Sequence, residues 1–122
     1  MADDSSSKNF KKALANLERS LASPISEPRD LSGILKDFEM SYELSWKVLK
    51  KRLLAQGHST QGARDVYSKA YQLGLISNQE LWLEMIEDRN QTAHVYDEAA
   101  ATKIYERIKS KYLQLFQSIS TV

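Results

Sequence analysis

The chain has 122 residues and 42% apolar side chains, enough for one folded domain but short for two. Its 17 basic and 16 acidic side chains leave a net charge of +1, which excludes the broadly basic surface of a general nucleic-acid binder. The absence of cysteine excludes disulfides and cysteine-bound zinc, and it fits a cytoplasmic protein. We expect no signal peptide and no membrane contact, because the chain begins with polar residues and no run approaches the roughly 18 apolar residues of a membrane span.

Apolar residues recur every three or four positions along most of the chain, which predicts helices. Residues 1–7 are polar and predict a disordered leader, and residues 8–122 predict a single helical-bundle domain. A first helix is expected over residues 8–22, ended by the prolines of SPISEPRD. A second and longer helix is expected over residues 30–56, with Asp30 as its N-cap and a glycine after it as its stop.

Three further helices complete the predicted fold. A short third helix is expected over residues 61–73. A fourth begins at the capping box SNQE, residues 77–80, and runs toward Arg89. A last helix, capped by Asp97, continues almost to the end of the chain. Because the connections are short, we predict an all-α, up-and-down antiparallel bundle of about five helices.

The stretch DRNQTAHVYD, residues 88–97, gathers unusual chemistry at the junction of the last two predicted helices. Histidine exchanges protons near neutral pH, and the arginine fork matches two phosphate oxygens. Arg89 and His94 could therefore cleave an RNA phosphodiester without a metal or cofactor, through attack by the ribose 2′-OH. On one ideal helix their directions differ by about 140°, so this hypothesis needs the helix to end or bend near residues 92–95.

Other interpretations of the same residues stay open. Arg89 could pair with Glu84, Asp88 or a carboxylate on the second helix, and His94 could cap a helix end. Glu39 and Glu43, four residues apart, suit either a metal pair or a solvated acidic face. Glu43 could instead reach across and orient Arg89 or His94.

Two other segments are weaker candidates. His58 lies in a glycine-containing loop. A histidine that simply stands at a helix end is a more common arrangement than a metal ligand, and we prefer it here. The run of Lys47, Lys50, Lys51 and Arg52 on the second helix is read as a solvated face, with phosphate contacts as the alternative.

The motif residues also carry a family resemblance. Arg89, His94 and Tyr96 stand in the pattern Arg-x4-His-x-Tyr, which resembles the signature of HEPN domains. FEMSYELSWKVLKKRL followed by DRNQTAHVYDE looks like the branch called nucleotidyltransferase substrate-binding proteins, over roughly residues 8–120. The resemblance implies a helical bundle that forms a homodimer, with the two motifs facing a shared cleft.

The resemblance also implies a function. It points to the toxin of a toxin–antitoxin pair, a metal-independent ribonuclease with Arg89 and His94 catalytic. A minimal nucleotidyltransferase partner would silence it by transferring AMP to Tyr96, and Asp88, Asn90 and Glu43 would support the site. The alternatives are a nucleotide- or substrate-binding subunit without turnover, and a purely structural dimeric partner. A twofold axis beside the motif would double the catalytic groups, so Arg89 and His94 are predicted to be partly exposed in a cleft.

Overall fold

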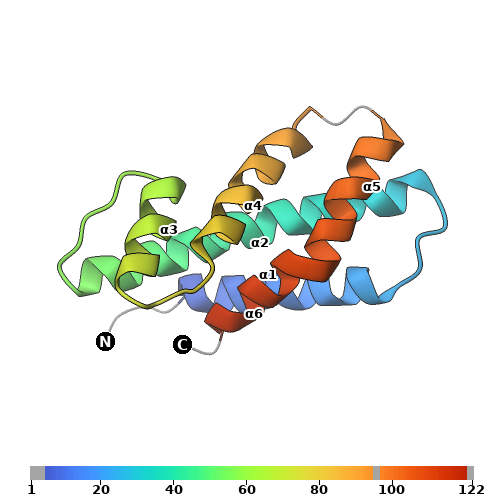
Figure 1. Cartoon of the computed structure of the whole chain (residues 1–122). Coiled ribbons are helices and arrows are strands. Elements are labelled where there is room, and N and C mark those ends of the chain that lie inside the picture. The colour runs from blue at the N-terminus through green and yellow to red at the C-terminus, as the bar shows by residue number, and fades with distance from the viewer. Residues whose placement is uncertain (1–4, 95–96, 121–122) are drawn as a thin grey trace.

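The structure, a computed structural model, describes residues 5–94 and 97–120. Within this part of the chain every regular element is a helix, and the predicted all-α class is confirmed. The last three elements follow one another without a gap and together form the fifth rod of the bundle (Figure 1). The elements are α1 (Ser5–Ala22), α2 (Pro28–Ala55), α3 (Ala63–Gln72), α4 (Gln79–Thr92), α5 (Glu98–Arg107), the π-helical segment η1 (Ile108–Tyr112) and α6 (Leu113–Ser120).

The long helix α2 is the axis of the molecule. Its 28 residues extend about 40 Å at 1.5 Å per residue, and α1 lies along it (Figure 1). The short helix α3 packs near its C-terminal end, while α4 and the α5–η1–α6 rod cross it (Figure 1). α2 therefore carries side chains that can meet every other helix of the bundle.

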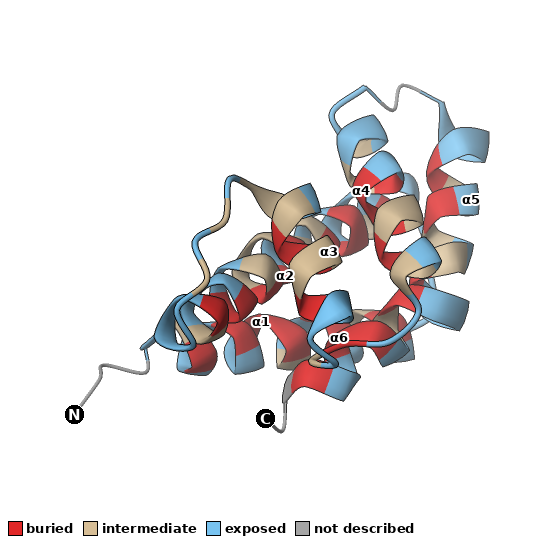
Figure 2. Ribbon diagram, turned by 60° about the vertical axis from the view of Figure 1, so that its left-hand side comes forward, coloured by how far each residue is buried: buried red, intermediate tan, exposed pale blue. Residues whose placement is uncertain are grey.

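The core is a continuous apolar cluster with aromatic rings at its centre. Tyr67 stacks on Trp82 at 4.6 Å between ring centroids, and Phe38 stacks on Tyr112 at 5.8 Å. Figure 2 shows that each helix turns its buried face inward and leaves an exposed face outside. Phe38 and Tyr42 are buried, as their four-residue spacing predicts, whereas Trp46 packs at the edge and is partly buried.

The starts of α1, α2 and α4 differ from prediction in ways that have a clear local cause. Helix α1 begins at Ser5, and Ser7 is buried against the bundle, so the predicted leader is too long at residues 5–7; residues 1–4 lie outside the described residues. Helix α2 begins at Pro28, because proline suits the first helical position, and Glu27 rather than Asp30 is the N-cap. Asp30 closes a capping box instead, accepting hydrogen bonds from the Ser26 and Glu27 amides at 2.8 and 3.1 Å.

The third difference is at the start of α4. Asn78, not Ser77, is the N-cap residue, and it has a left-handed backbone with φ 60°. Asparagine tolerates this conformation better than most residues. Because the helix starts after Asn78, Ser77 is not at the N-cap position and the predicted SNQE capping box does not form. The cap of the last rod is as predicted: the Asp97 carboxylate accepts a hydrogen bond from the Ala100 amide at 2.7 Å.

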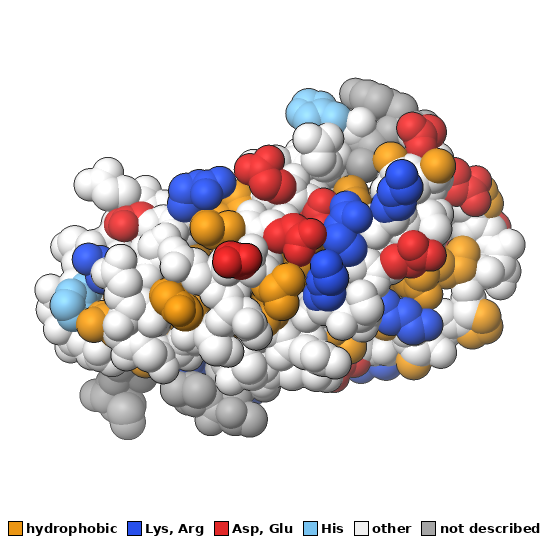
Figure 3. Space-filling view, viewed as in Figure 1, with side chains coloured by type: hydrophobic (Ala, Val, Ile, Leu, Met, Phe, Trp, Pro, Cys, Tyr) orange, Lys and Arg blue, Asp and Glu red, His pale blue; other side chains and the backbone are white. Residues whose placement is uncertain are grey.

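The surface has mixed charge. Figure 3 shows acidic and basic side chains interspersed on one face, in keeping with the small net charge. Among the described residues no helix combines the length and apolar character that a membrane span requires.

Candidate functional site

The C-terminal end of α4 forms the junction predicted from the motif. α4 ends at Thr92, whose hydroxyl donates to the Arg89 carbonyl oxygen at 2.7 Å and contacts the Glu39 carboxylate. The His94 amide closes the final turn on the Gln91 carbonyl at 2.9 Å. The helix therefore ends within the predicted interval, and Tyr96 lies outside the described residues.

Arg89 faces α2. Its Nη1 is 3.9 Å from Glu39 Oε2 and its Nη2 is 3.8 Å from Glu43 Oε2, and the guanidinium lies 5.9 Å from the centre of the Tyr42 ring. The predicted pairing with a second-helix carboxylate, Glu43 included, is confirmed. Both distances exceed hydrogen-bond length, so the two carboxylates hold the arginine by charge without engaging its N–H groups.

The Arg89 guanidinium keeps donor capacity at the surface. Its side chain is 26% exposed. Its Nε is buried and has no hydrogen-bond partner within the part of the chain that the structure describes. A buried donor without a partner is costly, but this nitrogen is out of reach of solvent, so a ligand would meet the exposed part of the side chain instead. Arg89 thus has the features of an anion-binding residue that is positioned before its ligand arrives.

Asp88 does not form the pair with Arg89 that the sequence left open as one alternative. Its buried carboxylate accepts from Arg107 Nε at 2.6 Å and from Arg107 Nη2 at 2.8 Å, and Tyr112 donates a third hydrogen bond. Asp88 therefore ties α4 to the last rod and does not pair with Arg89. Glu84, the other α4 candidate, pairs with Lys111 at 3.6 Å, and Asn90 is exposed on the outer side of α4.

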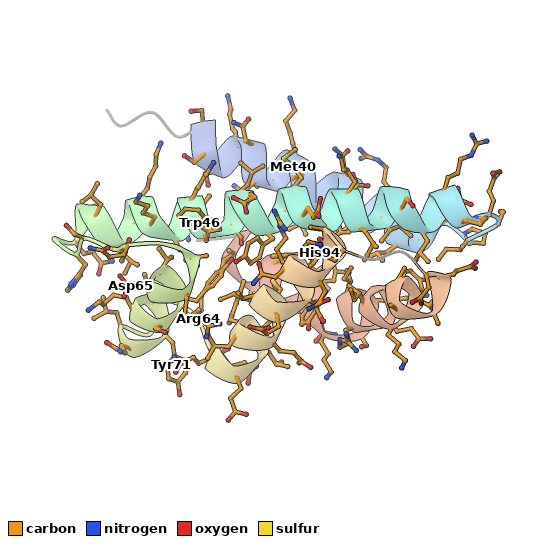
Figure 4. The ribbon with its side chains drawn as sticks, turned by 90° about the horizontal axis from the view of Figure 1, so that it is seen from above. Met40, Trp46, Arg64, Asp65, Tyr71 and His94 are labelled. Atoms are coloured by element: carbon orange, nitrogen blue, oxygen red, sulfur yellow. The ribbon has the colours of Figure 1, made fainter. Side chains whose placement is uncertain are left out.

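His94 lies on the other side of the junction. It is exposed, and Figure 4 shows it at the end of α4. Together with Gln91 and Lys103 it borders a hollow of about 240 Å³ between α4 and α5. Arg89 faces α2, whereas His94, beyond the end of α4, borders the hollow next to α5, so the end of the helix does not by itself bring the two side chains together. Arg89 is partly exposed and His94 is exposed, and within one chain they do not share a face; their predicted place in a cleft near a twofold axis stays a prediction.

A larger hollow lies on the Arg89 side of the junction. It measures about 520 Å³ and is bounded by the first half of α2, the end of α4 and the start of α5. This volume is in the range of small-ligand sites. Its wall is partly apolar and partly acidic, with Leu31, Leu35, Lys36, Glu39, Thr92 and Asp97 among its lining residues.

The weaker sequence candidates take structural roles. Glu39 and Glu43 both face Arg89, and the described residues contain no cluster of three or more metal-ligating side chains. The amide of His58 ends α2 by donating to the Leu53 carbonyl at 2.9 Å, which agrees with the helix-end interpretation. In the basic run, Lys47, Lys50 and Lys51 are exposed, as expected for a solvated face.

Three residues around the junction were not found from the sequence. Arg107 stands 19 residues after Asp88 and Tyr112 stands 24 after it, so no local spacing links them. Thr92 has no distinguishing pattern, although it joins α4 to Glu39. The only sequence feature that could have pointed to these partners of Asp88 is the presence of an arginine and a tyrosine, Arg107 and Tyr112, five residues apart on an amphipathic helix.

Burial changes the titration of three tyrosines. Desolvation, together with the nearby Glu43 carboxylate, raises the pKa of Tyr42 to about 12, against the opposing effect of Arg89. Burial also raises the pKa of Tyr67, and burial plus the hydrogen bond to Asp88 raises that of Tyr112. All three phenols stay protonated in the folded state at a pH where they ionise in the unfolded chain.

A pH dependence of stability follows from these tyrosines. Their contribution to folding is complete below pH 10, the ordinary phenol pKa, and falls as the pH rises toward the folded-state values. We expect the free energy of unfolding in denaturant to decrease between pH 10 and pH 12, with phenolate absorbance rising as the chain unfolds. A constant unfolding free energy across that interval would contradict the burial of these rings.

The fold and site together define a class: a small helical bundle with an arginine held at the end of its fourth helix and a histidine at the following junction. The family model described as "Nucleotidyltransferase substrate binding protein like" matches residues 5–122, and the chain belongs to this family. The family branch indicated by the sequence motif is thereby confirmed.

Individual relatives agree with this assignment. A Haemophilus influenzae protein named "Probable ribonuclease HepT" is 32% identical over 83 residues, which cover 64% of this chain and 57% of that protein. The match thus spans little more than half of the relative's length.

Two solved structures share the fold. A Thermus thermophilus protein superposes with a TM-score of 0.83 at 28% identity, covering 90% of this chain and 94% of the other. A Haemophilus influenzae protein, described as having the fold of a substrate binding domain of a nucleotidyltransferase, gives 0.84 at 25% identity, covering 94% and 96%.

Proposed function

We propose that the chain is a HEPN-type, metal-independent endoribonuclease, the toxin of a cytoplasmic toxin–antitoxin pair. The observation that carries the proposal is the state of Arg89, which is held by two carboxylates beyond hydrogen-bond distance and retains an unpartnered buried donor among the described residues. The similarity to a relative named a probable ribonuclease supports the same reading.

The proposed reaction is an internal transfer within RNA. The ribose 2′-oxygen attacks the adjacent phosphorus, the bond from phosphorus to the 5′-oxygen breaks, and a 2′,3′-cyclic phosphate and a 5′-hydroxyl result. One His94 takes the proton of the 2′-OH, and a protonated His94 gives a proton to the leaving oxygen. Arg89 stabilises the added charge on the non-bridging oxygens.

A homodimer completes this site. A single chain carries only one His94 and directs it away from the face of Arg89, whereas the reaction uses both a base and an acid. Two copies related by a twofold axis along the junction would supply two histidines and two arginines to one cleft. They would also pool positive charge that the near-neutral single chain lacks.

The proposed control is adenylylation by a minimal nucleotidyltransferase partner. The Tyr96 oxygen would attack the α-phosphorus of ATP, forming a phosphodiester to AMP and releasing pyrophosphate. The product adds a negative charge and bulk two residues from His94, which opposes the approach of RNA.

RNA cleavage in EDTA tests the proposal. Protein shown by intact mass to be unmodified at Tyr96 would be compared with protein carrying AMP there, on a mixed RNA pool. We expect the unmodified protein to leave 2′,3′-cyclic phosphate ends and the modified protein to leave the RNA intact. Intact RNA in both samples would overturn the ribonuclease assignment.

Glu43 is expected to affect turnover more than stability. Glu43→Gln leaves Arg89 with Glu39 as its remaining carboxylate partner, so the arginine should lose orientation and kcat should fall roughly 10-fold. The pair is partly exposed, so the unfolding free energy should change by less than about 1 kcal/mol. Glu87→Gln is the control. Glu87 also lies on α4 and is exposed, but its ion-pair partner is Arg64 on α3. Equal kinetics for the two variants would contradict the positioning of Arg89 by Glu43.

A second candidate function is a nucleotide-binding subunit without turnover, working with a nucleotidyltransferase. The hollow of about 520 Å³ favours it, because its apolar wall suits a nucleobase and Lys36 in its lining suits a phosphate; its lining residue Glu39 is also an ion-pair partner of Arg89. Calorimetric titration with ATP and AMP separates the two functions. Saturable binding by unmodified protein that cleaves no RNA would establish the second.

A further inference from the structure

The last rod of the bundle changes its helical repeat next to the candidate site. Residues 108–112 form a π-helix, and the Leu113 amide donates to the Ile108 carbonyl five residues back. π-Helical turns are rare in proteins and occur frequently at functional sites. At the two ends of this π turn stand Arg107 and Tyr112, and both side chains bind Asp88 on α4.

The wider turn brings Arg107 and Tyr112 to one place. The two residues are five apart, and on an α-helix they would differ in direction by about 140°. In a π turn the hydrogen bonds join positions i and i+5, so residues five apart come closer in direction than they do on an α-helix. Both side chains reach the same carboxylate, that of Asp88, with Arg107 binding its two oxygens.

The three residues form a closed network between α4 and the last rod. Asp88 and Tyr112 are buried, while Arg107 is about one-third exposed and uses two guanidinium nitrogens on Asp88. A bidentate pair with a third hydrogen bond allows little rotation of the carboxylate. The network therefore fixes the rotation of α4 about its own axis at residue 88.

Rotation at Asp88 sets the direction of the residues that follow it. Arg89 is the next residue, and it meets Glu39 and Glu43 on α2 at 3.9 and 3.8 Å only at this rotation. A turn of α4 by one residue step, about 100°, would carry Arg89 away from both carboxylates. His94 borders the same hollow as Asp88 and Arg107, so its surroundings depend on the network as well.

We infer that Asp88, Arg107 and Tyr112 are positioning residues for the site. In this inference the π turn is the device that lets one rod supply both partners of Asp88 and so aims Arg89 and His94. The inference rests on the proposed ribonuclease function for its effect on turnover. Its effect on the arrangement of α4 stands apart from that function.

Tyr112→Phe is the direct test, with Tyr67→Phe as the matched control. Each substitution removes one fully buried phenol hydroxyl and keeps the ring; the Tyr67 hydroxyl bonds Ser45 at 2.8 Å, away from the α4–α5 junction. We expect Tyr112→Phe to lower kcat for RNA cleavage about 10-fold with KM within twofold, and Tyr67→Phe to leave both within twofold. Similar melting temperatures for the two variants would show that stability is not the cause.

A second measurement decides the inference if the wild-type protein cleaves no RNA. Amide hydrogen exchange of residues 88–94 is expected to speed up at least fivefold in Tyr112→Phe and to stay unchanged in Tyr67→Phe. Absence of wild-type cleavage would overturn the proposed function alone. Unchanged exchange in Tyr112→Phe, or equal changes in both variants, would overturn the positioning role.

Discussion

Replacing Arg89 by alanine is expected to lower the kcat for RNA cleavage by about 10² to 10³, the usual effect of removing a group that stabilises transition-state charge. The guanidinium is already held between α2 carboxylates and retains an unpartnered donor among the described residues, so its contribution comes without rearrangement. Single-turnover rates on one RNA substrate give the value. The unfolding free energy should change by less than about 1 kcal/mol, because the ion pairs are long and partly exposed.

Arg64→Ala is the control for that experiment. Arg64 also joins two helices through a carboxylate, at 3.5 Å from Glu87, but it lies on α3 (Figure 4). Its loss should change the cleavage rate less than twofold. A small effect of Arg89→Ala, or an equal effect of both substitutions, would remove Arg89 from the proposed mechanism.

Replacing Asp88 by alanine is expected to lower the unfolding free energy by about 3 kcal/mol, the lower end of the range for breaking a buried ion pair. The lower end applies because Arg107 is partly exposed and can recover some hydration. Tyr112 cannot regain hydration in this way, because its ring is fully buried and its hydroxyl would lose its acceptor. Denaturant unfolding at neutral pH measures the change.

Asp37→Ala is the matched carboxylate control. Asp37 is partly buried, and within the described residues it accepts one hydrogen bond, from the Ser20 hydroxyl at 2.6 Å, and has no ion pair. Its loss should cost about 1 kcal/mol, the worth of one neutral hydrogen bond. A loss at Asp88 no larger than that at Asp37 would contradict the network between α4 and the last rod.

The fold was largely predictable because its signals are local. The three- and four-residue spacing of apolar side chains identifies each helix, and Asp97 caps the last rod as expected. The errors fall at helix starts, where several polar residues compete for the cap: Glu27 displaces Asp30, and Asn78 displaces Ser77. The π turn was not predicted, because the apolar spacing of the last rod fits an ordinary α-helix and the Asp88 partners on either side of the turn are distant from it in sequence.

The candidate site was predictable only in part. The end of α4 near Thr92 and the pairing of Arg89 with Glu43 follow from helix geometry and charge. The role of Asp88 does not, because its partners Arg107 and Tyr112 are brought to it by folding and not by sequence proximity. The cleft that would join Arg89 with a second His94 depends on a dimer and stays a prediction.

The most direct test of the central claim compares wild-type protein with His94→Ala, both unmodified at Tyr96, on one RNA in EDTA. His94 is exposed and its side chain supports no part of the core, so the variant should keep its fold. We predict cleavage to 2′,3′-cyclic phosphate ends by the wild type and a rate at least ~10²-fold lower for the variant, as expected for loss of a general acid–base group. Equal cleavage by both proteins would contradict a ribonuclease centred on His94.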